Sequence, residues 1–175
     1  MITLAILNYN GRAFLEAMLP TVAAQTAGGF RIHVIDDRER FASAERFPGS
    51  DIVVAPIPEW LQSADLPATA YVVILTRGHQ HDLEAMRALV PRELKYLGLI
   101  GSRAKVARIR TALLSEGLPA GDLDRVHAPI GLDIGAVTPA EIAVSILAEL
   151  IAVRRGVETS QMSMSVRERP TGAGV

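Results

Sequence analysis

Hydrophobic positions in this chain fall into short continuous runs, separated by longer segments with helical spacing. Five runs rich in β-branched residues predict strands at residues 2–7, 31–35, 51–54, 71–75 and 96–100. Because these runs are almost entirely apolar, they are typical of a parallel sheet that is covered on both faces. Helical spacing predicts helices at residues 13–24, 82–89, 104–115 and 139–154. The alternation predicts an α/β fold with a doubly wound, mainly parallel sheet and helices on both faces.

The last predicted helix is apolar around nearly its whole circumference. Its large apolar residues are Ile142, Val144, Ile146, Leu147, Leu150, Ile151 and Val153. A helix of this kind must be buried, and two locations remain open: the core of its own domain, or an interface between copies in a homo-oligomer. We expect residues 1–156 to form a single domain, and the polar residues 157–175 to form a flexible C-terminal tail.

Composition excludes several classes of function. The net charge is −1 and no long basic run is present, which argues against nucleic acid as a partner. The absence of cysteine excludes disulfides, thiolate metal ligands and a cysteine nucleophile. No apolar stretch reaches the ~20 residues of a membrane span. The N-terminal sequence lacks the basic region and cleavage site of a signal peptide, so we expect a cytoplasmic location.

Two predicted helix starts are candidates for a ligand-binding edge. Gly101, Ser102 and Arg103 follow a predicted strand and begin a helix. Free N–H groups and the helix dipole favour an anion at such a position, and an arginine can bind phosphate through two hydrogen bonds. Thr138 begins the last helix in a Thr-Pro-Ala-Glu sequence that fits a capping box. Ordinary helix capping without a ligand is the alternative interpretation of both.

The loop before Thr138 is rich in glycine and polar residues. Its candidate ligand residues are His127, Gly131, Asp133 and Gly135. Glycine allows sharp turns and close approach of the backbone to a ligand. In an open α/β sheet, ligands bind at the carboxyl ends of the strands, so we expect these loops to meet there.

A third polar loop follows the strand predicted at residues 71–75. It contains Thr76, Arg77 and His79, followed by His81 and Asp82. Two histidines and a carboxylate suggest a metal site, but no third, separated ligand is evident, so we assign no metal. We favour contacts with an anion or a polar ligand over metal binding. Polar capping of the next helix is the alternative.

The end of the second strand bears Asp36, Asp37 and Arg38. An acidic residue at this position binds the ribose in dinucleotide-binding folds. The loop after the first strand contains Asn10 and Gly11, but the G-x-G-x-x-G fingerprint is missing. The pattern therefore disfavours ordinary NAD(P) binding, although these five residues remain candidates for contact with a cofactor. A solvated strand end is the alternative interpretation of the two aspartates.

Four separated segments together resemble the XdhC/CoxI family. They are VIDDRERF, VVILTRGHQHD, YLGLIGSRAKVARI and HAPIGLDIGAVTPAEIAVSILAELIAVRRG. Members of this family are accessory factors for xanthine dehydrogenase, carbon monoxide dehydrogenase and related molybdenum hydroxylases. The resemblance covers residues 30–156 and implies a Rossmann-like domain. In the loop after the first strand, this chain has a single glycine where the family has a GAGH-type sequence.

The resemblance implies a non-catalytic chaperone that binds the molybdenum cofactor (molybdopterin). Such a protein presents the cofactor for sulfuration and assists its insertion into the target enzyme. The implied partners are a molybdenum hydroxylase of the xanthine or carbon monoxide dehydrogenase type, and a cysteine desulfurase as a separate source of sulfur. An NAD(P)-binding oxidoreductase and a nucleotide-binding regulatory or scaffold protein remain the alternatives.

Overall fold

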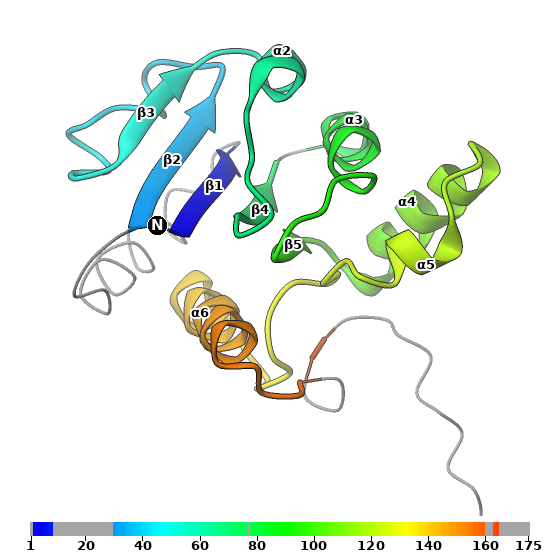
Figure 1. Cartoon of the computed structure of the whole chain (residues 1–175). Helices are drawn as coiled ribbons and strands as arrows, with labels where there is room; N and C mark the ends of the chain where they lie inside the picture. Colours follow the sequence, from blue (N-terminus) through cyan, green and yellow to red (C-terminus); the bar gives the residue numbers. More distant parts are fainter. Residues whose placement is uncertain (1, 9–29, 77, 160–162, 165–175) are drawn as a thin grey trace, which may run out of the picture.

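A five-stranded parallel sheet forms the centre of the computed structural model, which describes residues 2–8, 30–76, 78–159 and 163–164 (Figure 1). The strand order is β3-β2-β1-β4-β5, and all four neighbouring pairs are parallel. The strands are β1 (Ile2–Asn8), β2 (Phe30–Asp36), β3 (Asp51–Val54), β4 (Tyr71–Leu75) and β5 (Tyr96–Leu99). The predicted α/β fold class is confirmed, and each predicted strand is present to within about a residue at its ends.

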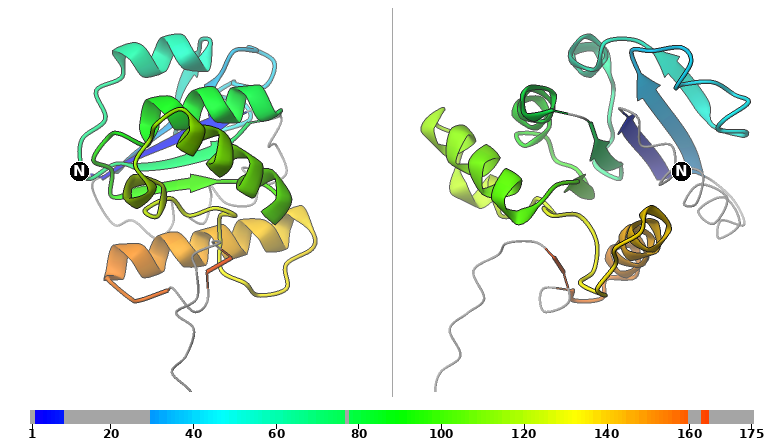
Figure 2. Two further views of the ribbon diagram at one scale, coloured as in Figure 1. Left: turned by 90° about the vertical axis from the view of Figure 1, so that its right-hand side faces the viewer. Right: turned by 180° about the vertical axis from the view of Figure 1, so that it is seen from behind.

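Helices cover both faces of this sheet. They are α2 (Ile57–Ser63), α3 (His79–Leu89), α4 (Arg103–Ser115), α5 (Ala120–Leu123) and α6 (Pro139–Arg155). Helices α2, α3 and α4 lie on one face and α6 lies on the other (Figure 2). The sequence did not predict α2 or α5, since both are short and α2 has a proline in its first turn. The helix predicted at residues 13–24 lies outside the described residues.

Two apolar clusters, one on each face of the sheet, form the core. Successive strand residues alternate between them, so that Val72 packs towards α2–α4 and Val73 packs towards α6. Ala143, Ile146 and Leu150 of α6 are buried in the second cluster. These three residues of α6 are therefore part of the domain core, which was one of the two predicted locations of the helix. Formation of a homo-oligomer stays a prediction. No helix in the described part of the chain combines the length and apolar composition that a membrane span requires.

A further chain segment extends the sheet beyond β5. His127 bridges Gly98 in parallel, and its N–H donates to Leu97 O at 2.8 Å. Ile130 N–H donates to Leu99 O at 3.0 Å. A Cβ at Gly98 would lie only 2.5 Å from Ile130 Cδ1, so glycine allows this close approach. The segment at 127–130 thus delivers the following loop to the same edge of the sheet as the ends of β4 and β5.

Described residues after α6 also contact this loop. Thr159 is buried, Ser163 forms an antiparallel bridge with Leu132, and Met164 N–H donates to Gly131 O at 2.9 Å. The division into a domain at 1–156 and a tail stays a prediction. Part of that expected tail is ordered against the domain.

Candidate functional site

The carboxyl edge of the sheet brings three of the predicted ligand loops together. The loop after β4, the start of α4 after β5, and the loop at 131–138 after the added segment leave adjacent strands at the same edge. Two ion pairs join them: Lys105 Nζ lies 2.5 Å from Asp82 Oδ2, and Arg103 Nη2 lies 3.5 Å from Asp133 Oδ2. The residues of these two pairs are 23 and 30 positions apart in the sequence, and the fold brings them together.

A buried polar cluster lies between the ends of β4 and β5. The Thr76 hydroxyl donates to Asp82 Oδ1, and the Asp82 side chain is fully buried. Lys105 Nζ lies 2.5 Å from the other carboxylate oxygen and 3.4 Å from Ile100 O. The sequence pattern indicated Thr76 but not Lys105, although the position of Lys105 three residues after the helix-capping Ser102 was a usable signal.

Glycine at position 101 makes room for the Lys105 side chain. A Cβ at Gly101 would lie 2.9 Å from Lys105 Cδ. The Lys105 side chain therefore folds back across the backbone before α4 and reaches Asp82. Ser102 caps α4 as predicted, since its hydroxyl accepts from Lys105 N–H at 3.2 Å. The cap and the ammonium group are thus held by the same short segment.

Arg103 points its guanidinium group to the surface at this edge. Its side chain is 69% exposed, and its partner Asp133 is also well exposed. Exposed ion pairs of this kind contribute about 0–1 kcal/mol. Arg103 can therefore exchange Asp133 for another anion at little energetic cost.

Thr138 begins α6 with the predicted capping box. Its hydroxyl accepts from Glu141 N–H at 3.3 Å, while Glu141 Oε2 accepts from the N–H groups of Thr138 and Val137 at 2.8 and 2.9 Å. These backbone hydrogen bonds from Thr138 and Val137 lower the pKa of Glu141. Three of the N–H groups at this helix start are therefore already satisfied within the protein, and a ligand contact by Thr138 or the positive-φ Gly135 stays a prediction.

Asp36 at the end of β2 is engaged by a neighbouring arginine. Arg38 donates from its backbone N–H and its Nε to Asp36 Oδ1, both at 3.0 Å, and from Nη2 to Oδ2 at 3.2 Å. The guanidinium group also lies 4.0 Å from the centre of the Phe41 ring. A ribose hydroxyl could reach this carboxylate only by displacing Arg38. Asp37, by contrast, is exposed.

His127 lies apart from this edge, in a network around the buried carboxylate of Glu149. Glu149 Oε2 accepts from Tyr96 OH at 2.6 Å and from Gly131 N–H at 2.9 Å. Its Oε1 accepts from Ser163 Oγ at 2.7 Å and lies 3.2 Å from His127 Nδ1. The His127 ring also stacks on Tyr96, with 4.4 Å between ring centres. The structure thus gives His127 internal contacts with Glu149 and Tyr96, and its contact with a ligand stays a prediction.

The network shifts the pKa values of Glu149 and Tyr96. Burial alone would raise the pKa of Glu149, but hydrogen bonding and charge from His127, with hydrogen bonds from Tyr96 and Ser163, hold it below its ordinary value. Burial and the nearby Glu149 charge raise the pKa of Tyr96 well above its ordinary value. Glu149 is therefore a charged carboxylate that accepts a hydrogen bond from the neutral phenol of Tyr96.

Gly131 fits closely beneath α6. Its φ is +101°, and a Cβ there would overlap the Ser145 hydroxyl and approach Ile146 N to 3.3 Å. Glycine is thus required for the hydrogen bond from Gly131 N–H to Glu149. The packing beneath α6 thus explains why a glycine stands at position 131, without reference to a ligand.

Three predicted site residues, Asn10, Gly11 and Arg77, lie outside the described residues. For His79 only the backbone at the start of α3 is described. Among the described residues, no group of three or more His, Asp or Glu side chains could hold a metal ion.

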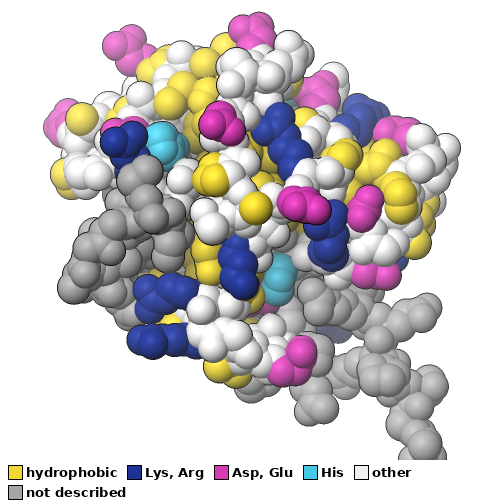
Figure 3. Space-filling model, viewed as in Figure 1, with side chains coloured by type: hydrophobic (Ala, Val, Ile, Leu, Met, Phe, Trp, Pro, Cys, Tyr) yellow, Lys and Arg dark blue, Asp and Glu magenta, His cyan; other side chains and the backbone are white. Residues whose placement is uncertain are grey.

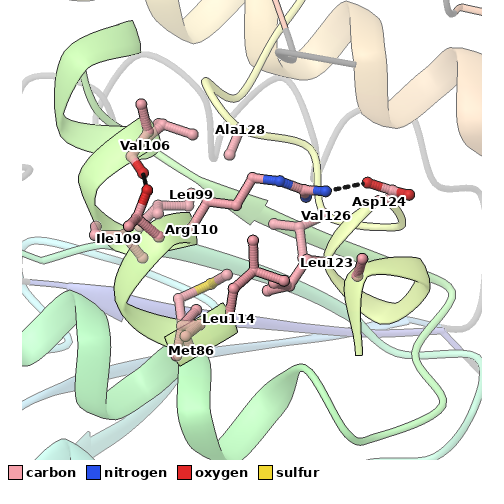
Figure 4. A pocket seen from close by; sticks show the side chains of 14 residues that line it. Met86, Leu99, Val106, Ile109, Arg110, Leu114, Leu123, Asp124, Val126 and Ala128 are labelled. Atoms are coloured by element: carbon pink, nitrogen blue, oxygen red, sulfur yellow. Dashed lines mark hydrogen bonds and ion pairs between the residues drawn. The ribbon is translucent and has the colours of Figure 1, made fainter. Parts of the chain in front are cut away.

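An apolar groove of about 770 Å³ lies between α4, α5 and β5 (Figure 4). Leu99, Ile109, Leu114 and Leu123 are among its lining residues, and the ion pair of Arg110 with Asp124 spans one side at 2.6 Å. None of the predicted ligand residues lines it. On the face seen in Figure 3, acidic and basic side chains are interspersed over the upper part, and several basic side chains lie together at the lower left.

Comparisons with known proteins identify the family of this fold. A family model described as the XdhC Rossmann domain matches residues 16–150. The chain is 36% identical over 141 residues to a probable xanthine dehydrogenase subunit from Bacillus subtilis, covering 79% of this chain and 40% of that protein. It is 35% identical over 135 residues to the uncharacterized protein YqeB of Escherichia coli, covering 75% of this chain and 25% of that protein.

A solved structure shares the whole arrangement. The crystal structure of a xanthine dehydrogenase from Bacillus halodurans superimposes with a TM-score of 0.74 and 27% identity, covering 91% of this chain and 45% of that one. The chain therefore spans between a quarter and a half of the length of these relatives. With most of its sequence matched by the family model, the chain belongs to the XdhC Rossmann domain family.

Proposed function

We propose that the protein is an accessory factor for a molybdenum hydroxylase of the xanthine dehydrogenase type, and that it binds the molybdenum cofactor for sulfuration and insertion. Membership of the XdhC family and the names of two relatives support the link to xanthine dehydrogenase. In this proposal the protein acts in the cytoplasm, and a separate cysteine desulfurase supplies the sulfur, because the chain has no cysteine.

The observation that carries the proposal is the set of hydrogen-bond donors at the carboxyl edge. Ser102 begins α4, so the first-turn N–H groups of Arg103 and Ala104 have no acceptor within the helix. The exposed guanidinium group of Arg103 and the ammonium group of Lys105 belong to the same first turn of α4. Such a set suits a phosphate or another anionic oxygen, and molybdopterin carries a phosphate.

These residues would bind and orient the cofactor. The start of α4 would hold its anionic end, and Arg103 would exchange Asp133 for it. The bound cofactor supplies the molybdenum centre that a target hydroxylase needs. The chain's own contribution is to keep the cofactor at one edge of a rigid sheet, where a second protein can reach it.

Cofactor content tests this proposal directly. The protein is purified without air from cells that make the cofactor and, as a control, from cells with cofactor synthesis disabled. Pterin is then extracted with acid and measured by fluorescence. We expect bound pterin in the first preparation only, together with faster activation of a cofactor-free xanthine dehydrogenase. If pterin is absent and activation is unchanged, the proposal is wrong.

A further inference from the structure

Lys105 is fixed more firmly than Arg103, the other described cation at the start of α4 that faces the carboxyl edge. Its side chain crosses Gly101. Nζ then lies between Asp82, in the first turn of α3, and Ile100 O, directly after β5. Only 21% of the side chain is exposed, against 69% for Arg103. A lysine loses side-chain entropy when a ligand fixes it, and here folding has already fixed the side chain.

The ammonium group has one donor left for a ligand. An ammonium group carries three N–H donors. One donates to Ile100 O at 3.4 Å, and Asp82 Oδ2 lies 2.5 Å from Nζ as its ion-pair partner; no further acceptor is found among the residues that the structure describes. The first-turn N–H groups of α4 lie on the same short segment, so several donors can converge on one anionic group.

Asp82 and Thr76 hold this ammonium group in place. The Thr76 hydroxyl donates to Asp82 Oδ1, which leaves Oδ2 for Lys105. The carboxylate is fully buried, so its charge must be balanced within the protein. Because both of its oxygens are engaged, Asp82 keeps a single orientation and holds Lys105 at a single position.

We infer that Lys105 is the residue that recognises the phosphate of the ligand, and that Asp82 and Thr76 are its positioning residues. This inference rests on the proposed function and deepens it. The ligand is a polar organic molecule with a phosphate group, which enters between the start of α4 and the loop at 131–138. Arg103 adds a contact at the rim, but its exposed side chain is ordered only when the ligand binds.

The main test replaces the ion pair with a neutral pair of the same shape. In the double variant Asp82→Asn/Lys105→Gln, no buried charge is left without a partner, so the fold is retained. The control is Arg108→Gln, which removes one positive charge from an exposed position of the same helix. Thermal unfolding of the three proteins checks that each is folded before binding is compared.

Two probes separate the inference from the proposed function. The first is molybdenum cofactor released from a purified hydroxylase, titrated without air and followed by pterin fluorescence. Relative to the control, we expect the double variant to bind it roughly 10- to 100-fold more weakly, as for the loss of one charge-assisted hydrogen bond. The single variant Asp82→Asn retains the ammonium group and should lie between them. A purely structural role would change the unfolding temperature and leave these dissociation constants alike.

The second probe is inorganic phosphate, titrated by calorimetry. We expect roughly millimolar affinity in the wild type and in the control, and none in the double variant. If the wild type binds phosphate but not the cofactor, the proposed function is wrong and the role of Lys105 as a phosphate-binding residue stands. If the double variant binds either probe within twofold of the control, or if the wild type binds neither, the inference is wrong.

Discussion

Asp82 and Glu149 are two fully buried carboxylates in one small domain, and their surroundings differ in one decisive respect. Glu149 is contacted by four partners from three chain segments, among them Tyr96 of β5 and Ser163 beyond α6. The Asp82 carboxylate is contacted by Thr76 and by Lys105, and Lys105 is itself partly exposed with a donor to spare. A carboxylate surrounded only by internal donors stabilises a fold, whereas one that orients an accessible cation also leaves that cation within reach of solvent or a ligand.

The location of each carboxylate supports the same distinction. Asp82 lies at the carboxyl edge, where open α/β sheets bind their ligands. Glu149 lies in α6 against the end strand of the sheet, where it joins β5, the segment at 127–130 and the residues after α6. Burial alone therefore does not identify a functional group, and the unused hydrogen-bonding capacity of its partner is the better guide.

The largest effect is expected for Glu149→Ala. The substitution leaves the Tyr96 hydroxyl, the Gly131 N–H and the neighbouring His127 without their buried acceptor. Breaking a buried network of this kind costs about 3–5 kcal/mol. Urea unfolding measures the loss, with Glu93→Ala outside the network as the control. A loss below about 1 kcal/mol would show that the network is not a structural centre.

A smaller loss of about 2 kcal/mol is expected for Asp82→Ala. Thr76 loses its acceptor, but Lys105 can swing into water because its side chain is already partly exposed. The double variant Asp82→Asn/Lys105→Gln should recover most of this stability in the same urea experiment. A loss as large as that of Glu149→Ala would remove the distinction between the two carboxylates.

Local rules explain why the sequence predicted so much of this structure. The parallel strands follow from continuous apolar runs, and the starts of α4 and α6 follow from Ser102 and from the sequence at Thr138. Each of these signals lies within a few residues of the feature that it specifies. The meeting of the polar loops at one edge was also predictable, because all strands of a parallel sheet end on the same side.

Long-range contacts explain what the sequence analysis missed. The hydrogen bond from Tyr96 to Glu149 joins residues 53 positions apart, and no local pattern encodes it. Glu149 was overlooked within an apolar helix, although a carboxylate in the middle of such a helix was itself a signal that it needs buried partners. Lys105 was not among the predicted site residues, because only the tertiary position of Asp82 turns it inward.

The pH dependence of stability offers a finer comparison. The folded protein holds the pKa of Glu149 below its ordinary value, so this group stabilises the fold fully above the ordinary glutamate pKa of about 4.3. The contribution is lost as the pH falls below that value and through the pKa of the folded state. Urea unfolding at pH 6 and at pH 3.5 should therefore show a smaller difference between wild type and Glu149→Gln at the lower pH. An unchanged difference would mean that the charge of Glu149 does not matter.

The smallest effect on stability is expected at the exposed edge of the site. Arg103→Ala removes a 3.5 Å ion pair between two exposed side chains, so unfolding by urea should change by less than about 0.5 kcal/mol. Binding of the released cofactor should nevertheless weaken, by less than in the double variant Asp82→Asn/Lys105→Gln, since Arg103 must be ordered when the ligand binds. Asp133→Asn is the matched control, because it frees Arg103 without removing it and should leave binding unchanged or slightly stronger. If Arg103→Ala weakened binding more than the loss of Lys105, the exposed arginine and not the positioned lysine would be the main anion-binding residue.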